Sequence, residues 1–139
     1  MSRDIAGLGD LRFLYVGVAD TDAALEVWQR TLGATLRWRF QAFAADVAAV
    51  EIGAGPLVLL ADHRPDGSVL PIYEVASLES ARAALLDSGA TVVGPLGTPE
   101  GDAIVVEMGD GVEIAMIEVI RPGAMDAAFA DEANEHRVW

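Results

Sequence analysis

The sequence predicts an α+β fold in which one βαβββ module occurs twice in tandem, because a stretch of the chain repeats itself. Residues 18–24 return in similar form as residues 75–81. Each copy leads to the same tripeptide, first Gly33-Ala34-Thr35 and then Gly89-Ala90-Thr91. Two copies with so long a period do not make a solenoid, so duplication of one supersecondary unit explains the repeat.

The first module begins with a strand over residues 11–18, where apolar side chains alternate between two faces. Asp20 or Thr21 can cap the following helix, because a short side-chain oxygen accepts an orphan backbone N–H group. Gly33 lies where a helix commonly ends in a left-handed residue. Strand-like runs follow at residues 35–41, 47–52 and 56–61. The residues at helical spacing that predict a stripe buried against the sheet are Ala24, Leu25, Trp28 and Leu32.

The second module repeats this order, with a strand over residues 70–75, a helix cap at Ser77 and a helix end at Gly89. Strands are predicted over residues 91–94, 103–108 and 112–119, and Asp110-Gly111 is a strong hairpin-turn signal. A further helix is predicted over residues 124–135, with Met125, Phe129 and Ala133 at helical spacing. We expect one domain over residues 1–139, made of module one (about 11–62), module two (about 70–120) and a C-terminal tail (121–139).

The formal net charge is -13 at pH 7, with only 9 Lys and Arg residues. So few basic side chains cannot form the positive surface that nucleic acid requires, so we expect no nucleic-acid partner. An acidic field favours cationic ligands, although acidic surfaces also simply keep proteins soluble. No apolar run is long enough to span a membrane and no secretory signal begins the chain, so a cytoplasmic protein is the default expectation.

The order of elements resembles the vicinal oxygen chelate superfamily of glyoxalases, extradiol dioxygenases and bleomycin-resistance proteins. The local resemblance runs from Val16-Gly17-Val18-Ala19-Asp20 through Trp28 to Leu32-Gly33. In the second half it lies in Tyr73-Glu74-Val75 and in Asp110-Gly111-Val112-Glu113-Ile114. The resemblance covers residues 11–120. It implies curled mixed sheets around a cup, a small-molecule ligand and a homodimer.

Metal-dependent members of this superfamily carry one ligand near the start of each module's first strand and one glutamate on its last strand. Carried over by position, the first-strand sites fall on Phe13 and Leu70, and the last-strand sites fall on Ala115 and about Val58. None of these side chains offers the N, O or S donor that a divalent cation needs. We therefore expect neither a metal nor another cofactor.

Two glutamates are candidate acid/base groups. Period two places Glu74 on a face with Leu70 and Ile72, and Glu113 on a face with Ala115. If these faces line the cup, the two carboxylates approach each other in apolar surroundings, where burial raises a carboxyl pKa. The alternative is that both carboxylates lie near strand ends and stay solvated.

Apolar and aromatic side chains on the faces that line the cup can form a ligand site, because such sites are usually apolar with a few placed polar groups. The alternative is that these side chains simply fill the core. Period two places Leu36 and Phe40 on the face of Trp38, and it places Arg37 and Arg39 on the opposite face, where a solvated edge is expected. The candidate ligand-binding residues are Phe13, Tyr15, Trp38, Leu70, Ile72 and Ala115.

The function that fits best is binding or sequestering a small, cationic or aromatic molecule in an apolar cup. The alternative is an enzyme of lyase, isomerase or dioxygenase-like type, either metal-free with Glu74 and Glu113 or with a metal site that position matching misses. An interaction module with a filled cup is a third possibility. His63, in the loop between the modules, is expected to be exposed, although it is available as a general base.

Overall fold

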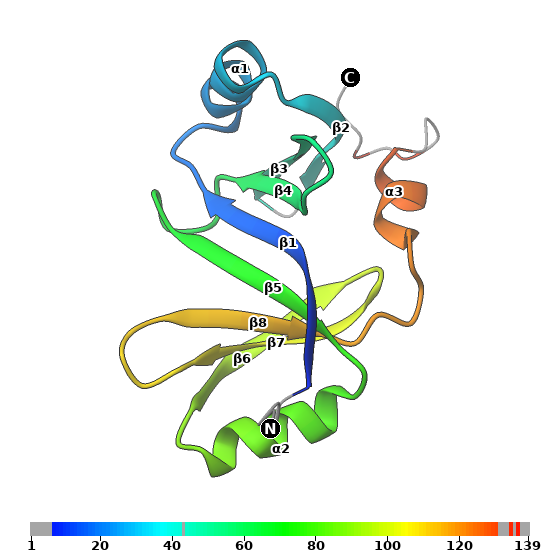
Figure 1. Cartoon of the computed structure of the whole chain (residues 1–139). Coiled ribbons are helices and arrows are strands. Elements are labelled where there is room, and N and C mark those ends of the chain that lie inside the picture. The colour runs from blue at the N-terminus through cyan, green and yellow to red at the C-terminus, as the bar shows by residue number, and fades with distance from the viewer. Residues whose placement is uncertain (1–6, 43, 131–133, 135, 137–139) are drawn as a thin grey trace. The chain divides into compact units, whose positions relative to one another are not determined.

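The computed structural model describes residues 7–42, 44–130, 134 and 136. Within them the chain forms eight strands and three helices, an α+β fold with a mixed sheet (Figure 1). In chain order these are β1 (Leu8–Gly17), α1 (Thr21–Leu32), β2 (Thr35–Ala42), β3 (Ala45–Glu51), β4 (Leu57–Ala61), β5 (Val69–Val75), α2 (Leu78–Asp87), β6 (Thr91–Thr98), β7 (Gly101–Glu107), β8 (Glu113–Ile117) and α3 (Ala124–Phe129).

The chain divides into two compact units that follow the duplication closely. The first-module unit comprises Phe13–Val69 and Gly123–Trp139. The second-module unit comprises Leu70–Pro122 and Met1–Arg12. Strand β1 therefore contributes its first half to the second-module unit and its second half to the first-module unit.

Both units share one strand topology. In the first-module unit the order is β2-β3-β4-β1, with β1 parallel to β4 and the other neighbours antiparallel. In the second-module unit the order is β6-β7-β8-β5, with β5 parallel to β8 and the other neighbours antiparallel. Even the irregularities match, because the register shifts between Leu36 and Trp38 and again between Val92 and Gly94. The shared order and the shared bulge confirm the predicted duplication of a βαβββ module.

The helix boundaries follow local chemistry. The side chain of Asp20 accepts a hydrogen bond from the backbone N–H of Ala23 at 3.2 Å, and Gly33 ends α1 at φ 70°. Ser77 caps α2 in the same way. Thr21 is not the cap; its hydroxyl donates to the carbonyl of Asp46 at 2.9 Å.

Helices α1 and α2 each cover one face of the strands in their own unit (Figure 1). The cluster beneath α1 contains Leu25, Ala34, Ala48, Val50, Val58 and Leu60, with Trp28 packed against it. The cluster beneath α2 contains Val75, Ala81, Leu85, Ala90, Val106 and Met116. The predicted helix stripes are confirmed except at Leu32, which is 51% exposed.

Two elements differ most in length from the sequence expectation. Strand β6 continues past Gly94 to Thr98. It is an edge strand of the sheet, where Pro95 costs no ladder hydrogen bond to a further neighbour. Helix α3 ends at Phe129, and the rest of the predicted helix falls partly on residues outside the described ones. In the part of the chain that the structure describes, no helix has the length and apolar character needed to cross a membrane.

Candidate functional site

The sheet face of the first-module unit that points away from α1 carries a row of aromatic residues. Tyr15 lies beside Leu59, Leu59 beside Ala49, and Ala49 beside Trp38, so this row crosses all four strands on one face. Tyr15 is 9% exposed and Trp38 is 3% exposed. We call this the aromatic face, defined by Phe13, Tyr15, Trp38 and Phe40.

The duplicated module has a different set of residues in the equivalent row. There Ile72 lies beside Ala115, Ala115 beside Val105, and Val105 beside Gly94. Leu70, Ile72 and Ala115 are 1%, 2% and 0% exposed. The predicted ligand-binding residues therefore fall on two corresponding faces, one in each unit, and only the face of the first-module unit is aromatic.

The bulge in β2 corrects the expected faces of this strand. The extra residue at the register shift turns Leu36 toward the α1 side, where it packs against the core cluster, while Trp38 and Phe40 stay on the aromatic face. Period two predicted Leu36 on the face of Trp38, which is wrong because a bulge interrupts the alternation.

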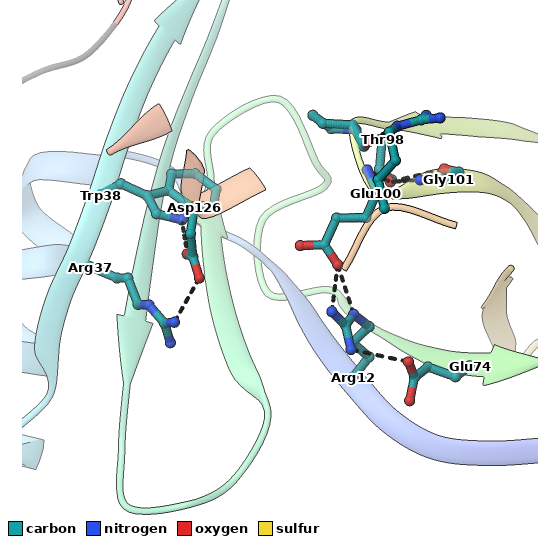
Figure 2. Close-up of polar contacts among 10 residues, drawn as sticks. Arg12, Arg37, Trp38, Glu74, Thr98, Glu100, Gly101 and Asp126 are labelled. Atoms are coloured by element: carbon teal, nitrogen blue, oxygen red, sulfur yellow. Dashed lines mark hydrogen bonds and ion pairs between the residues drawn. The ribbon is translucent and has the colours of Figure 1, made fainter. Parts of the chain in front are cut away.

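The same bulge lets two adjacent side chains reach one carboxylate. Trp38 Nε1–H donates to Asp126 Oδ1 at 3.0 Å, and Arg37 Nη2 donates to Asp126 Oδ2 at 2.6 Å (Figure 2). Arg37 also pairs with Glu51. Arg39 is buried at 8% exposure and pairs with Asp22 and Asp46, so it does not lie on the expected solvated edge.

Helix α3 lies against β2 on the aromatic face. The ring of Phe129 is 4.8 Å from the ring of Trp38 and 4.5 Å from that of Phe40, measured between centroids. Met125 in the same helix is 5% exposed. Because α1 covers the opposite face, the sheet of the first-module unit has a helix on each side, and α3 closes the β2 end of the aromatic face.

At the β1 end of this face, Tyr15 meets the loop that follows β4. Its hydroxyl lies 2.6 Å from His63 Nε2, and the guanidinium carbon of Arg64 lies 5.6 Å from the centre of the tyrosine ring. Burial raises the pKa of Tyr15 to about 12, with a smaller opposing effect of Arg64. Burial also lowers the pKa of His63, an effect that Arg64 reinforces and Asp62 opposes. At neutral pH both side chains are therefore uncharged, and the tautomer of the imidazole decides which of the two groups donates. His63 is exposed as expected, but nothing in the sequence indicated its contact with Tyr15.

A glycine holds this loop in place. The backbone N–H of Gly17 donates to the carbonyl of Ser68 at 2.8 Å, and the N–H of Gly67 donates back to the carbonyl of Gly17 at 2.9 Å. A Cβ atom on Gly17 would lie 1.9 Å from the carbonyl oxygen of Pro65. Only glycine allows so close an approach, and the loop carrying His63 is thereby fixed beside Tyr15.

In the second-module unit, Glu74 belongs to an ion-paired cluster. Arg12 donates from Nη1 to Glu74 at 3.0 Å and from Nε and Nη2 to Glu100 at 2.9 and 2.6 Å (Figure 2). The side chain of Glu100 is 4% exposed and that of Glu74 is 32% exposed. Thr98 shapes the turn that buries Glu100, since its hydroxyl oxygen accepts from the N–H groups of Glu100 and Gly101.

The strand register separates the two candidate acid/base glutamates. Glu74 lies beside Ile117, and Glu113 lies four residues earlier on the same strand, about 13 Å away at the usual rise per residue. Glu113 instead lies opposite Glu107, whose carboxylate accepts from the N–H groups of the following turn. The sheet does not bring the two carboxylates together.

The positions that the family resemblance implies for metal ligands do not fit a divalent cation. Tyr15 pairs with Leu59 as Ile72 pairs with Ala115, so the counterpart of Ala115 is Leu59 and not Val58, which packs beneath α1. Leu59 also lacks a donor atom. Across the described residues no group of three or more His, Cys, Asp and Glu side chains is placed to hold a metal ion.

A surface hollow of about 230 Å³ lies beside β2 in the first-module unit. It is lined by Arg37, Glu51, Leu57 and the turn at Gly53–Gly55. Its two charged side chains neutralise each other, and Arg37 is further engaged by Asp126. The hollow therefore offers a ligand no uncompensated charge.

The strand order, the paired modules and their helices are those of the glyoxalase/bleomycin-resistance-like fold, which confirms the predicted fold. Methylmalonyl-CoA epimerase from Mycobacterium tuberculosis matches with a TM-score of 0.70 and 17% identity, over 90% of this chain and 96% of that one. Hypothetical protein BH1468 from Bacillus halodurans C-125 matches with a TM-score of 0.68 and 14% identity, over 81% of this chain and 95% of that one.

A variant of Streptomyces coelicolor methylmalonyl-CoA epimerase in complex with 2-nitronate-propionyl-CoA has a TM-score of 0.66 and 16% identity, covering 82% of this chain and 99% of that one. At these identities the likeness shows the fold alone. The sequence matches no protein-family model, and no curated protein matches it at a significant level.

Proposed function

We propose that the protein binds a small aromatic molecule on the aromatic face of the first-module unit, without a metal or another cofactor. The observation that carries the proposal is the difference between the two modules. The row Tyr15–Leu59–Ala49–Trp38 is aromatic at both ends, whereas its duplicate is built from Ile72, Ala115, Val105 and Gly94. Aliphatic residues suffice to pack such a face, so the added rings point to recognition of a guest.

The middle of the aromatic face supports this proposal. Ala49 and Ala61 are small residues on the strands between Tyr15 and Trp38. Leu59 and Val47 lie beside them on the same face, so the surface between the rings is aliphatic, and Tyr15 and Trp38 are three strand spacings apart, about 14 Å. A flat aromatic guest suits an aliphatic surface with a ring at each end.

Phe129 indicates how such a guest would be accommodated. Its ring lies on Trp38 and Phe40 and belongs to α3, a helix of only 6 residues that is not part of the duplicated module. An aromatic guest would take the place of this ring, and α3 would act as a lid that exchanges its own phenylalanine for the ligand.

The proposal retains a homodimer, which the resemblance to the superfamily implies, and a cytoplasmic location. The net charge of -13 favours a guest without a strong overall negative charge. The matched epimerases have structures with coenzyme A compounds. Polyanions of that kind suit this chain poorly.

An enzyme that uses Glu74 and Glu113 has less support. Glu74 is held by Arg12, and the register keeps Glu113 about 13 Å from it along the strands. A general base must reach its proton directly or through one water, so these two groups cannot serve one reacting centre as a pair.

The test is a screen of small aromatic compounds by thermal unfolding, since a guest that binds only the native state raises the melting temperature. Compounds that raise it are then titrated against Tyr15→Ile, which installs the residue of the duplicate module. We expect about two- to tenfold weaker binding, because a stacked ring contributes about 0.5–1.5 kcal/mol beyond its buried area. Tyr73→Phe, in the second-module unit, is the matched control and should bind as before. If no aromatic compound shifts the melting temperature, the proposal fails.

A further inference from the structure

We propose that Arg64 and His63 form a carboxylate-binding site at the β1 end of the aromatic face, so that the guest is a small aromatic carboxylate. This inference rests on the proposed function, because the aromatic face supplies the apolar half of the site. It adds the polar group that orients the guest, which the sequence analysis did not assign.

Arg64 has no carboxylate partner among the ion pairs of the described residues. Arg12, Arg30, Arg37 and Arg39 each pair with carboxylates of the chain. Arg64 stands over the ring of Tyr15, and its Nε is buried without a hydrogen-bond partner among the described residues. A buried N–H group normally has a partner, so this atom invites an acceptor that the chain itself does not provide.

The imidazole of His63 can supply a second donor to the same guest. Tyr15 Oη lies 2.6 Å from His63 Nε2, and the lowered pKa of His63 keeps the ring neutral. In the tautomer in which Nε2 accepts from Tyr15 O–H, the ring proton is on Nδ1, and this nitrogen is a second donor for the guest. The nearest acid, Asp62, is already engaged, since its Oδ1 accepts from the N–H of Asp46 at 2.9 Å.

The loop that carries His63 and Arg64 is ordered before any guest binds. The loop bearing both donors is fixed by the two backbone hydrogen bonds of Gly17 and by the hydroxyl of Ser68, which donates to the carbonyl of Pro65 at 2.6 Å. A guest therefore meets donors that are already ordered, and little freedom is lost on binding. A carboxylate matches the planar fork of an arginine better than a cation or an alcohol does.

The experiment compares four probes on the full chain by NMR titration: benzoate, benzyl alcohol, benzylammonium and acetate. We expect benzoate to bind about tenfold or more tightly than benzyl alcohol and to shift the imidazole signals of His63. Arg64→Gln should remove this preference, and Arg64→Lys should restore part of it. Arg82→Gln, an exposed arginine on α2, is the charge-matched control and should behave as the parent chain does. Retained melting temperatures establish that the variants are folded.

The outcomes separate the two proposals. Benzyl alcohol or benzylammonium binding as tightly as benzoate overturns the carboxylate site and leaves the aromatic guest standing. Acetate binding as tightly as benzoate, with loss in Arg64→Gln, supports the anion site and counts against the aromatic face. Failure of all four probes to bind overturns the carboxylate site, and the wider aromatic screen then decides the proposed function by itself.

Discussion

Replacing Gly17 by alanine tests whether the loop after β4 is held against β1 as closely as the structure requires. The added Cβ would lie 1.9 Å from the carbonyl oxygen of Pro65 and 2.7 Å from the hydroxyl of Ser68. Ordinary van der Waals contact begins near 3.4 Å, so the loop must retreat by about 1.5 Å. The obstacle is backbone, which cannot step aside as a flexible side chain can.

The expected loss follows from the bonds that this retreat breaks. Two backbone hydrogen bonds join Gly17 to the loop, and each contributes about 0.5–1.5 kcal/mol net. Alanine recovers about 0.5–1 kcal/mol by restricting the unfolded chain. The free energy of unfolding should therefore fall by about 1–2 kcal/mol, which corresponds to a melting temperature lower by about 4–8 °C for a chain of this size.

Urea unfolding followed by circular dichroism measures this difference, and the NMR signals of His63 report whether its hydrogen bond to Tyr15 survives. Gly97→Ala is the matched control, because Gly97 also lies in a strand and a Cβ there meets nothing within 4 Å. It should be neutral or slightly stabilising. If Gly17→Ala unfolds at the same urea concentration as the parent chain and the His63 signals are unchanged, the inference that Gly17 holds this loop in place is wrong.

Four further substitutions address other parts of the chain. Arg12→Gln removes the hydrogen bonds donated to buried Glu100 and should cost about 3 kcal/mol in urea unfolding. Arg30→Gln breaks an exposed pair and should change stability by less than about 0.5 kcal/mol, so equal effects would contradict the difference in burial. Because burial lowers the pKa of His63 below 6.5, the unfolded chain takes up this proton first as the pH falls. The stability difference between the parent chain and His63→Gln should therefore favour the parent most above pH 6.5 and shrink below it; a constant difference between pH 8 and pH 5 would refute this. Phe129→Ala should lower stability yet strengthen binding of any aromatic guest, and weaker binding by calorimetry would exclude the lid.

The modules, helices and strand order could be predicted because their signals are local. An N-cap such as Asp20, a left-handed glycine such as Gly33 and alternating apolar residues each act within a few positions. The bulge at residue 37 could not be predicted, because nothing in Arg37-Trp38-Arg39 marks the extra residue. One unmarked insertion was enough to move Leu36 to the other face.

The long-range polar contacts were missed for a different reason. Arg12 and Glu100 are far apart in sequence, and Pro99-Glu100-Gly101 has the composition of an exposed turn. The contact between His63 and Tyr15 was missed for the same reason. A signal for it did exist, since a glycine inside a strand, here Gly17, often marks the close approach of another backbone segment.

The duplication acts as an internal control on the choice between packing and recognition. Across one pair of strands the first module has Trp38 beside Ala49, and the second has Gly94 beside Val105. Tryptophan with alanine fills considerably more volume than glycine with valine, but the ring of Phe129 in α3 covers Trp38, so Trp38 alone is compatible with ordinary core packing. Tyr15 is not explained in this way, because replacing its counterpart Ile72 by tyrosine adds a hydroxyl that must find a partner once buried. Here the partner is His63, held on a loop that a strand glycine allows to approach. Packing gains nothing from burying a hydroxyl and an unpartnered guanidinium nitrogen beside an imidazole, whereas a binding site needs such groups.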